Sequence, residues 1–329
     1  MKLFKHILYV SETSVAQEPS IARAVSVAEN NQADLTVIDV IPPITAGIGM
    51  LPGGHTSGEL QTAMVSEGRK GLESLVEPYK ERLSIRLDVL QGKTYLEVIR
   101  AILRHQYDLL IKPAENPNFI ERLFGSDDMQ LLRNCPCPVW LTRSEEKSDY
   151  ACILAAVDVD PDMPDEIEQN LNRQILELSS SLAISKFVPL NVVHAWDAPF
   201  EKKVRSWSDS DAVMAYVDGE RSRHEIAFTR LGKQLRDQIG TEAYDHLSPQ
   251  FHLRRGIPSR VIPQTVKELQ ADLVVMGTVA RTGIAGWLIG NTAEAILEQL
   301  QCSVLAVKPP GFVSPVKLAE EEAPRPTSR

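Results

Sequence analysis

The feature that most constrains the fold of this chain is that its second half repeats the pattern of its first half. Matching segments recur in the same order in both halves. The pairs are residues 4–12 with 151–158, 34–40 with 189–195, 92–111 with 256–275, and 137–141 with 302–306. A fixed order of matching segments over half a chain indicates duplication of one domain, because a solenoid repeat would recur at a much shorter interval.

The length of the chain and one charged segment fit a division into two domains. Its 329 residues are enough for two domains of roughly 150 residues each. Hydrophobic residues make up 43% of the chain, which suffices for a core in each half. Residues 143–149 are charged and lack apolar periodicity, so they are the expected linker. We therefore expect domains at residues 1–143 and 151–309, followed by a disordered tail at 310–329 that is rich in glutamate and proline.

In each half, short apolar runs alternate with longer segments of helical periodicity. The runs are almost continuously apolar, as expected for parallel strands that are covered on both faces. Helix-spaced apolar residues occur at 19–30, 96–104, 165–180, 260–269 and 292–300. This alternation predicts two tandem Rossmann-like α/β domains, each with a mainly parallel five-stranded sheet and helices on both faces.

Two helical segments of the second half have features of their own. Residues 212–239 are highly charged but carry an apolar stripe that includes Val213 and Phe228, which predicts a solvated helix with one packed face. Pro263 falls inside the segment 260–269. Because proline lacks a backbone N–H, we expect it in the first turn of that helix or at a kink.

The charge balance and the N-terminus argue against several classes of protein. The chain has 35 Lys and Arg against 44 Asp and Glu, a formal charge of −9, so nonspecific binding to nucleic acid or to an anionic membrane is not expected. Residues 1–10 lack the apolar core of a signal peptide, and no apolar stretch is long enough to cross a bilayer. Four cysteines are too few for a disulfide scaffold, so we expect reduced thiols and a cytoplasmic protein without membrane insertion.

The most informative segment for function is residues 275–294. An apolar strand ends at Met276, a glycine-rich loop follows, and a helix begins near Asn291. The free backbone N–H groups and the positive end of such a helix suit a phosphate, and Asn291 or Thr292 could cap the helix. The alternative is that the glycines only allow tight turns and close helix–sheet packing. The segment is neither a Walker loop nor a dinucleotide-binding fingerprint, since it lacks both glycine spacings.

With this loop, the duplicated α/β halves resemble the tandem universal stress proteins, whose domains are adenine nucleotide alpha hydrolase-like. In nucleotide-binding members, the loop has a glycine, two residues, a second glycine, nine residues, and a third glycine followed by serine or threonine. Gly277 and Gly290 take the outer glycine positions of this pattern. Ala280 stands at the middle glycine, and Asn291 replaces the hydroxyl residue. The resemblance covers nearly the whole chain except two loops and the tail.

The resemblance also implies where the rest of a nucleotide would bind. Asp158 matches the acidic residue near the adenosine, although a strand-end cap explains this aspartate equally well. Ala195 matches the position whose backbone faces adenine. The implied ligand is ATP or AMP, with Mg²⁺ as an accompanying ion. The full set of implied nucleotide-binding residues is Asp158, Ala195, Met276, Gly277, Ala280, Gly290, Asn291 and Thr292.

The first half departs further from the nucleotide-binding pattern. Glu12 and Val40 match the acidic and adenine-facing positions, but of the loop only Gly125 and Ser126 remain. Prolines there remove backbone donors, and acidic residues bring negative charge close to any phosphate. These residues are Pro113, Pro117, Glu115, Asp127 and Asp128. We therefore expect a degenerate copy that does not bind nucleotide.

Other combinations of residues are weaker candidates for chemistry. Cys135 and Cys137 could form a metal or redox pair, but no second pair with ligand spacing follows them, so packing is favoured. His194, His246 and His252 lie near aspartates in the sequence and form a weaker metal hypothesis. No nucleophile elbow or zinc-binding helix motif is present. The sequence thus predicts no catalytic residue, and at most slow ATP hydrolysis without a convincing general base.

Two hypotheses for function follow. The first is a cytoplasmic stress-response protein that holds an adenine nucleotide in its second half and acts as a regulator. The second is a stress adaptor whose altered pocket binds another phosphorylated or lipid-linked metabolite, or a protein partner, without ATP. Ala280 and the apolar residues Ile284, Trp287, Leu288 and Ile289 favour the second hypothesis. The resemblance further implies that the two halves pair as a pseudo-dimer, and it leaves a further homo-oligomer open.

Overall fold

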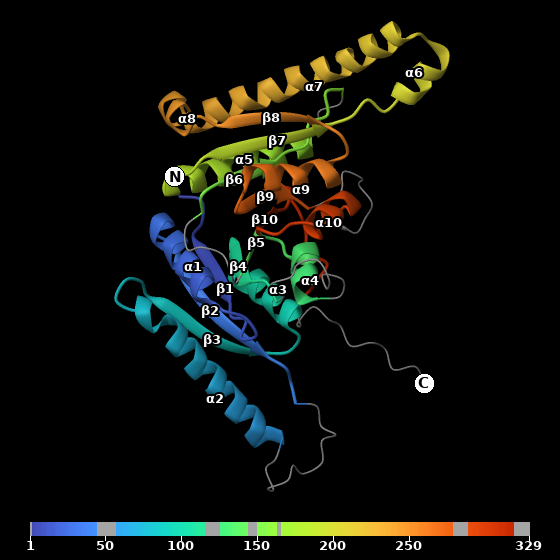
Figure 1. The fold of residues 1–329 in the computed structure, drawn as a ribbon. Coiled ribbons are helices and arrows are strands. Elements are labelled where there is room, and N and C mark those ends of the chain that lie inside the picture. Colours follow the sequence, from blue (N-terminus) through green and yellow to red (C-terminus); the bar gives the residue numbers. More distant parts are fainter. Residues whose placement is uncertain are drawn as a thin grey trace, which may run out of the picture. The chain divides into compact units, whose positions relative to one another are not determined.

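The computed structural model in Figure 1 describes six stretches of the chain, which fall into two compact units. The described residues of unit 1 are 2–44, 57–115, 126–143 and 312–318. Those of unit 2 are 150–162, 166–278 and 289–311. The duplication expected from the sequence is thus present as two tandem domains.

Both units alternate strands and helices along the chain (Figure 1). Unit 1 contains β1 (His6–Val10), α1 (Glu18–Asn31), β2 (Asp34–Ile41), α2 (Ser57–Val76), a 3-10 helix (Glu77–Tyr79), β3 (Ile85–Gln91), α3 (Thr94–His105), β4 (Leu109–Pro113), α4 (Asp127–Asn134) and β5 (Val139–Thr142). Unit 2 contains β6 (Ile153–Ala156), α5 (Glu166–Lys186), β7 (Leu190–Trp196), α6 (Glu201–Trp207), α7 (Ser210–Ile239), α8 (Thr241–Leu247), β8 (Gln250–Arg255), α9 (Pro258–Leu269), β9 (Leu273–Gly277), α10 (Asn291–Leu297) and β10 (Ser303–Val307). Among these described helices, none has the length and apolar character needed to span a bilayer.

Each unit is built on a parallel sheet. The strand order is β3-β2-β1-β4-β5 in unit 1 and β8-β7-β6-β9-β10 in unit 2. The strand pairs within each unit are parallel. Right-handed crossovers place the helices on both faces of such a sheet, and accordingly α1 contacts α2 whereas α3 contacts α4. The predicted Rossmann-like α/β fold is confirmed.

The strand registers match the two halves residue by residue. Ile7 of β1 pairs with Leu109 of β4, and Ile153 of β6 pairs with Leu273 of β9. Ile7 and Ile153 therefore hold the same place in their sheets. Counting along the strands from such pairs matches Glu12 with Asp158, Val40 with Ala195, and Lys112 with Met276.

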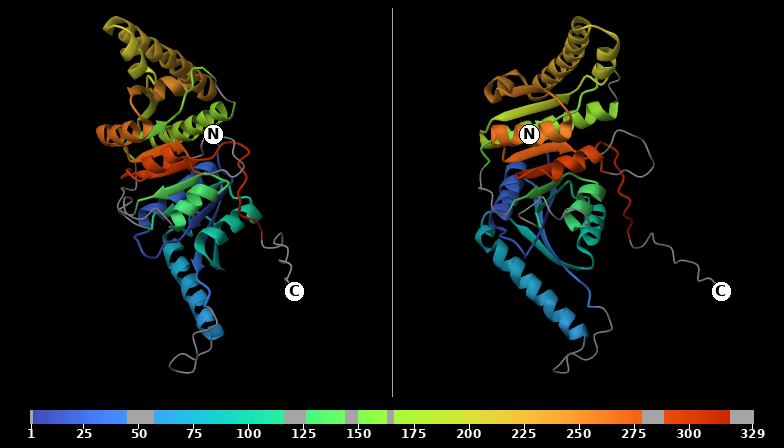
Figure 2. Two further views of the ribbon diagram at one scale, coloured as in Figure 1. Left: turned by 90° about the vertical axis from the view of Figure 1, so that its right-hand side faces the viewer. Right: turned by 45° about the vertical axis from the view of Figure 1, so that its right-hand side comes forward.

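The two units differ in what joins their second and third strands. In unit 1, α2 packs along β2 and β3. In unit 2, the connection holds α6, α7 and α8, which are yellow to orange in Figure 2, and α7 contacts β7 and β8. Val213 and Phe228 are buried on α7, so the apolar stripe predicted for this helix is confirmed. The insertion thereby adds a second layer of side chains beside β7 and β8.

Pro263 lies inside α9, which begins at Pro258, so of the two places expected for it the first turn is excluded. A proline at this position cannot donate to the carbonyl oxygen four residues earlier, which belongs to Ser259. That oxygen instead accepts a hydrogen bond from Gln299 Nε2 at 2.9 Å. A side chain that follows α10 therefore satisfies the acceptor that the proline leaves open.

Residues 312–318 of the expected C-terminal tail belong to unit 1. Phe312 and Ser314 are buried, and Arg100 Nε on α3 donates to the carbonyl oxygen of Lys317 at 3.4 Å. Residues 312–318 are thus part of unit 1, with two buried residues and a hydrogen bond to α3. The remaining residues, 319–329, lie outside the described part of the chain.

Candidate functional site

In unit 2, the topology brings separate segments together at the carboxyl edge of the sheet. β6 and β9 are parallel neighbours, with Ala156 paired to Met276, so the segments that follow both strands emerge side by side. Asp158 follows β6 at this edge, and Ala195 lies near the end of β7, the other neighbour of β6. In open parallel sheets this edge is where ligands bind.

Asp158 is held through its backbone, and its residue is exposed at the edge. Its N–H donates to Asn172 Oδ1 at 3.3 Å, and Asn172 Nδ2 donates to the carbonyl oxygen of Asp158 at 2.5 Å. Asn172 is buried on α5. Asn172, which sequence reasoning missed, thus holds the backbone just after β6. The available signal was a single asparagine on the apolar face of a predicted helix.

Gly277 has a packing role at the end of β9. A Cβ atom at this position would lie 2.7 Å from Leu171 Cδ2 on α5, which is closer than real side chains approach. Met276 beside it is buried. For Gly277, the structure favours the alternative of close helix–sheet packing.

The start of α10 differs from the sequence-based expectation. Gly290 is the N-cap residue, whereas Asn291 and Thr292 lie in the first turn and are exposed, so neither of them caps the helix. The N–H of Gly290 donates to the carbonyl oxygen of Thr278 at 3.0 Å. This donor is therefore used within the protein, and a phosphate would meet the N–H groups of the first turn instead. The segment 279–288, which includes Ala280, lies outside the described residues.

A buried lysine that sequence reasoning missed lies at the same edge. Lys308 follows β10 directly, and only 3% of it is exposed. Its Nζ donates to Thr278 Oγ1 at 2.8 Å, and the N–H of Thr278 donates to the carbonyl oxygen of Val307 at 3.3 Å. An ammonium group therefore sits where the loop after β9 begins. A lysine placed directly after the last apolar strand was the signal in the sequence.

The insertion helix α7 adds a histidine pair next to Ala195. His194 Nε2 on β7 lies 2.9 Å from His224 Nδ1 on α7, and His194 Nδ1 lies 3.3 Å from the carbonyl oxygen of Val157. The ring of His224 also approaches Trp196, with 6.0 Å between the ring centroids. Burial lowers the pKa of His224 below its ordinary value. This shift disfavours the protonated form of His224, which lies near the position expected to face adenine.

The other histidines do not assemble the metal site considered from the sequence. His252 Nε2 lies 2.7 Å from Asn191 Oδ1. The ring of His246 contacts the ring of Phe187 edge to face, with centroids 6.4 Å apart. Within the stretches that the structure describes, no three or more His, Cys, Asp or Glu residues are arranged to hold a metal ion.

Cys135 and Cys137 lie close together in the core of unit 1. Their Sγ atoms are 3.5 Å apart, and both residues are buried. The hydrogen bond with Cys135, together with burial, raises the pKa of the Cys137 thiol well above its ordinary value. A thiol that resists ionisation is a poor metal ligand and a poor nucleophile, so packing remains the favoured interpretation.

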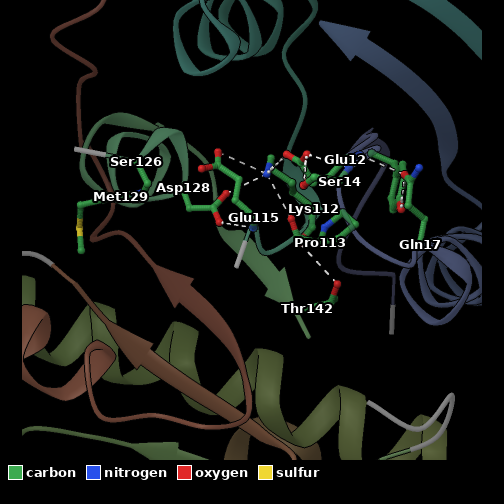
Figure 3. A network of polar contacts seen from close by, with 11 residues as sticks. Glu12, Ser14, Gln17, Lys112, Pro113, Glu115, Ser126, Asp128, Met129 and Thr142 are labelled. Atoms are coloured by element: carbon green, nitrogen blue, oxygen red, sulfur yellow. Dashed lines mark hydrogen bonds and ion pairs between the residues drawn. The ribbon is translucent and has the colours of Figure 1, made fainter. Parts of the chain in front are cut away.

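At the matching edge of unit 1, a buried lysine is surrounded by carboxylates (Figure 3). Lys112 on β4 is fully buried. Its Nζ lies 2.9 Å from Asp128 Oδ1, 3.0 Å from Glu12 Oε2 and 3.6 Å from Glu115 Oε1. It also donates to the carbonyl oxygen of Pro113 at 3.2 Å. We call Lys112, Glu12, Glu115 and Asp128 the unit 1 charge cluster.

The unit 1 charge cluster also uses backbone donors that an anionic ligand would need. Asp128 Oδ2 accepts the N–H of Glu115 at 2.8 Å. Ser126 caps α4, with its Oγ accepting the N–H of Met129 at 3.2 Å. A phosphate at this edge would have to displace carboxylates that the protein itself supplies.

Both units match the same group of known proteins. The family model described as "Universal stress protein family" matches residues 3–143 and 152–308. Universal stress protein E of Photorhabdus laumondii is 27% identical, covering 98% of this chain and 100% of the relative. Universal stress protein E of Escherichia coli K12 is 26% identical, covering 98% of this chain and 99% of the relative.

Solved structures share the tandem fold over most of the chain. A structure from Pseudomonas aeruginosa UCBPP-PA14 is 25% identical, with a TM-score of 0.66 and 94% of each chain covered. A universal stress protein from Archaeoglobus fulgidus is 15% identical, with a TM-score of 0.61, covering 92% of this chain and 96% of that chain. The second likeness concerns the fold alone.

Proposed function

The chain belongs to the universal stress protein family, and we propose that it is a cytoplasmic stress-response protein whose unit 2 binds an adenine nucleotide in a regulatory role. In this proposal, unit 1 does not bind nucleotide. Two tandem family domains in one chain fit an intramolecular pseudo-dimer.

One difference between matched positions carries the proposal. Where unit 1 has Lys112 and Asp128, unit 2 has Met276 and Ala293, when Lys112 is counted along β4 and β9 and Asp128 is counted back from β5 and β10. The ion pair that fills the edge of unit 1 therefore has no counterpart at these positions of unit 2. This replacement removes the carboxylate that would compete with a phosphate for the N–H donors there.

We assign the phosphates to the first turn of α10. Asn291 and Thr292 are exposed there and contribute side-chain donors in addition to their N–H groups. Lys308 supplies a cation at the same edge, which counters the unfavourable formal charge of −9 locally. Asp158 and the backbone of Ala195 would hold the adenosine, as the resemblance to nucleotide-binding members implies. The loop residues that complete the proposed site are Met276, Gly277, Ala280 and Gly290.

The proposed role is regulatory and not catalytic. We assign no general base to the site, so ATP hydrolysis would be slow at most. A Mg²⁺ ion accompanying ATP would be bound chiefly through the phosphates, as is usual for this ion. Phosphate release that is equally slow in wild type and in Asp158→Ala would exclude the enzymatic version.

A second candidate function is favoured by two observations at the loop. Gly277 is accounted for by packing against Leu171, and the N–H of Gly290 is already bonded to Thr278. Both observations weaken the likeness to a nucleotide loop. The alternative is a stress adaptor in which this edge binds another phosphorylated or lipid-linked metabolite, or a protein partner, without ATP.

Isothermal titration of the full chain, freed of any retained ligand, tests the proposal with ATP and AMP as probes. We expect one binding event per chain, lost in Gly290→Val and retained in Gly125→Val, the matched change in unit 1. No heat with either nucleotide would overturn nucleotide binding. Native mass spectrometry of freshly purified protein then distinguishes the second candidate, because a retained metabolite would show its own mass.

A further inference from the structure

The unit 1 charge cluster contains more negative than positive charge. With all of its groups ionised, three carboxylates face one ammonium, which leaves two negative charges without a partner inside the cluster. Lys112 is fully buried and Asp128 is only 3% exposed, so water screens this excess poorly. Binding of one proton by a carboxyl group relieves such an excess.

The geometry selects Glu115 for this proton. Its Oε1 lies 3.6 Å from Lys112 Nζ, whereas the nearest oxygens of Glu12 and Asp128 lie at 3.0 and 2.9 Å. Glu12 also accepts a hydrogen bond from Ser14 Oγ at 2.7 Å, which stabilises its ionised form. The N–H of Glu115 is bonded to Asp128, and this bond keeps the two acidic residues close to each other. Of the three carboxylates, Glu115 thus lies farthest from the Lys112 ammonium, and it has the carboxylate of Asp128 nearby.

We propose that the unit 1 charge cluster is a proton-operated latch that holds α4 to the carboxyl ends of β1 and β4 while Glu115 is protonated, and loosens when Glu115 ionises. The cluster is suited to this because its members come from separate segments. Glu12 follows β1, Lys112 lies on β4, and Asp128 lies in the first turn of α4. An added negative charge on Glu115 repels Asp128 directly, and α4 has only eight residues to resist the repulsion. The latch does not depend on nucleotide binding by unit 2.

The charged groups around Glu115 set the pH at which the latch works. Burial raises the pKa of Glu115 to about 7, Asp128, Asp127 and Glu12 add to the rise, and Lys112 opposes it. Burial raises the pKa of Asp128 as well. Burial would lower the pKa of Lys112, but its carboxylate partners outweigh this and raise it. For Glu12, burial is outweighed by Lys112 and the Ser14 hydroxyl, which lower its pKa.

The raised pKa of Glu115 determines how the stability of the latch changes with pH. The folded form holds a proton on Glu115 at pH values where the unfolded chain has lost it. The resulting contribution to stability is complete below the ordinary glutamate pKa and is lost as the pH rises through about 7. Helix α4 should therefore be held most firmly in mildly acidic solution.

A carboxyl titration followed by NMR tests the protonation step directly. In the full chain carrying ¹³C-labelled glutamate, we expect the Glu115 carboxyl signal, assigned through its backbone, to titrate with a midpoint near 7. The wild-type titration does not depend on any variant being able to fold. A midpoint below about 5, in the ordinary range for glutamate, would overturn the proposal.

Hydrogen exchange of α4 tests the mechanical step. After correction for the intrinsic pH dependence of exchange, we expect residues 127–134 of the wild type to be several-fold less protected at pH 8 than at pH 6. Glu115→Gln should keep the same protection at both pH values. Glu73→Gln, which removes an exposed carboxylate paired with Arg69 on α2, is the matched control and should respond like the wild type. Equal protection of α4 at both pH values in the wild type would refute the latch.

Discussion

At the carboxyl edge of its sheet, unit 1 has a lysine and an aspartate that form an ion pair, whereas unit 2 has apolar residues at the matched positions. Lys112 and Asp128 form an ion pair at 2.9 Å, and their counterparts are Met276 and Ala293. Unit 2 instead carries its buried ammonium on Lys308, which is bonded to a hydroxyl group. One fold thus places a cation at the same edge in two ways, and only in unit 1 do the named carboxylates surround it.

The two units also differ in the interactions that stabilise the carboxyl edges of their sheets. Unit 1 relies on charge, because its edge residues are buried and ionisable. At the edge of unit 2, Asn172 forms neutral hydrogen bonds with the backbone of Asp158, and Lys308 donates to a neutral hydroxyl group instead of a carboxylate. Different substitutions should therefore destabilise the two units. A change of pH should affect their local stability in opposite directions.

Replacing Lys112 by methionine, the residue of unit 2 at that position, should have the largest effect. It leaves the carboxylates of the cluster buried without their cation, and breaking a buried ion pair in this way costs about 3–5 kcal/mol. Hydrogen exchange of the β1 and β4 amides should show the loss as a lower free energy of opening. Adding Asp128→Ala should restore part of it. If the single variant is as stable as the wild type, charge does not hold this edge together.

Asn172→Ala tests the neutral hydrogen bonds of unit 2. It removes the two hydrogen bonds that Asn172 forms with the backbone of Asp158, which should cost about 1–3 kcal/mol. Hydrogen exchange should show weaker protection in β6 and no change in β1. Asn134→Ala, which removes a hydrogen bond between two side chains of α4, is the control and should change little. An undisturbed β6 would mean that Asn172 does not hold the backbone of Asp158.

Lys308→Met tests whether the ammonium of unit 2 serves a ligand. Loss of a charge-assisted hydrogen bond to phosphate should weaken ATP binding roughly tenfold to hundredfold. Titration calorimetry should show the loss, with a smaller effect on AMP, which carries fewer phosphates. Arg143→Met changes the matched position of unit 1 and should leave the affinity unchanged, and Lys308→Arg should retain most of it. Equal affinity of Lys308→Met and wild type would remove Lys308 from the proposed site.

The smallest expected effect is an opposite response of the two units to pH. Unit 1 should lose local stability as the pH rises through about 7, because the pKa of Glu115 is raised. Burial lowers the pKa of His224, so unit 2 keeps its stability above the ordinary histidine pKa and loses it as the pH falls through the lowered value. We expect the protection of α4 from hydrogen exchange to fall, and that of α7 to rise, as the pH increases over about pH 5 to 8, after correction for the intrinsic pH dependence of exchange. His224→Phe should flatten the response of α7 alone, and parallel slopes in the wild type would contradict the comparison.

Most of the fold was predictable from the sequence, and the candidate site only in part. The repeat and the apolar periodicity predicted the strands and helices, and the topology then placed Asp158 and Ala195 at one edge, as the resemblance implied. The sequence placed the cap of α10 at Asn291 or Thr292, one or two residues too late, because helix boundaries depend on backbone geometry as well as on side-chain preference. It did not reveal Asn172 or Lys308, since neither belongs to the glycine pattern that directed attention to the loop.

The sequence by itself determined the duplicated α/β architecture, because apolar periodicity is a local property and parallel sheets with crossovers satisfy it in only a few ways. It also determined that the two halves differ in charge near the loop. Only the tertiary structure decided which charges meet. Glu12 and Lys112 are 100 residues apart in the chain and 3.0 Å apart in the fold. The energy of such a contact depends on distance and burial, and neither quantity is set by the pattern of residues along the chain.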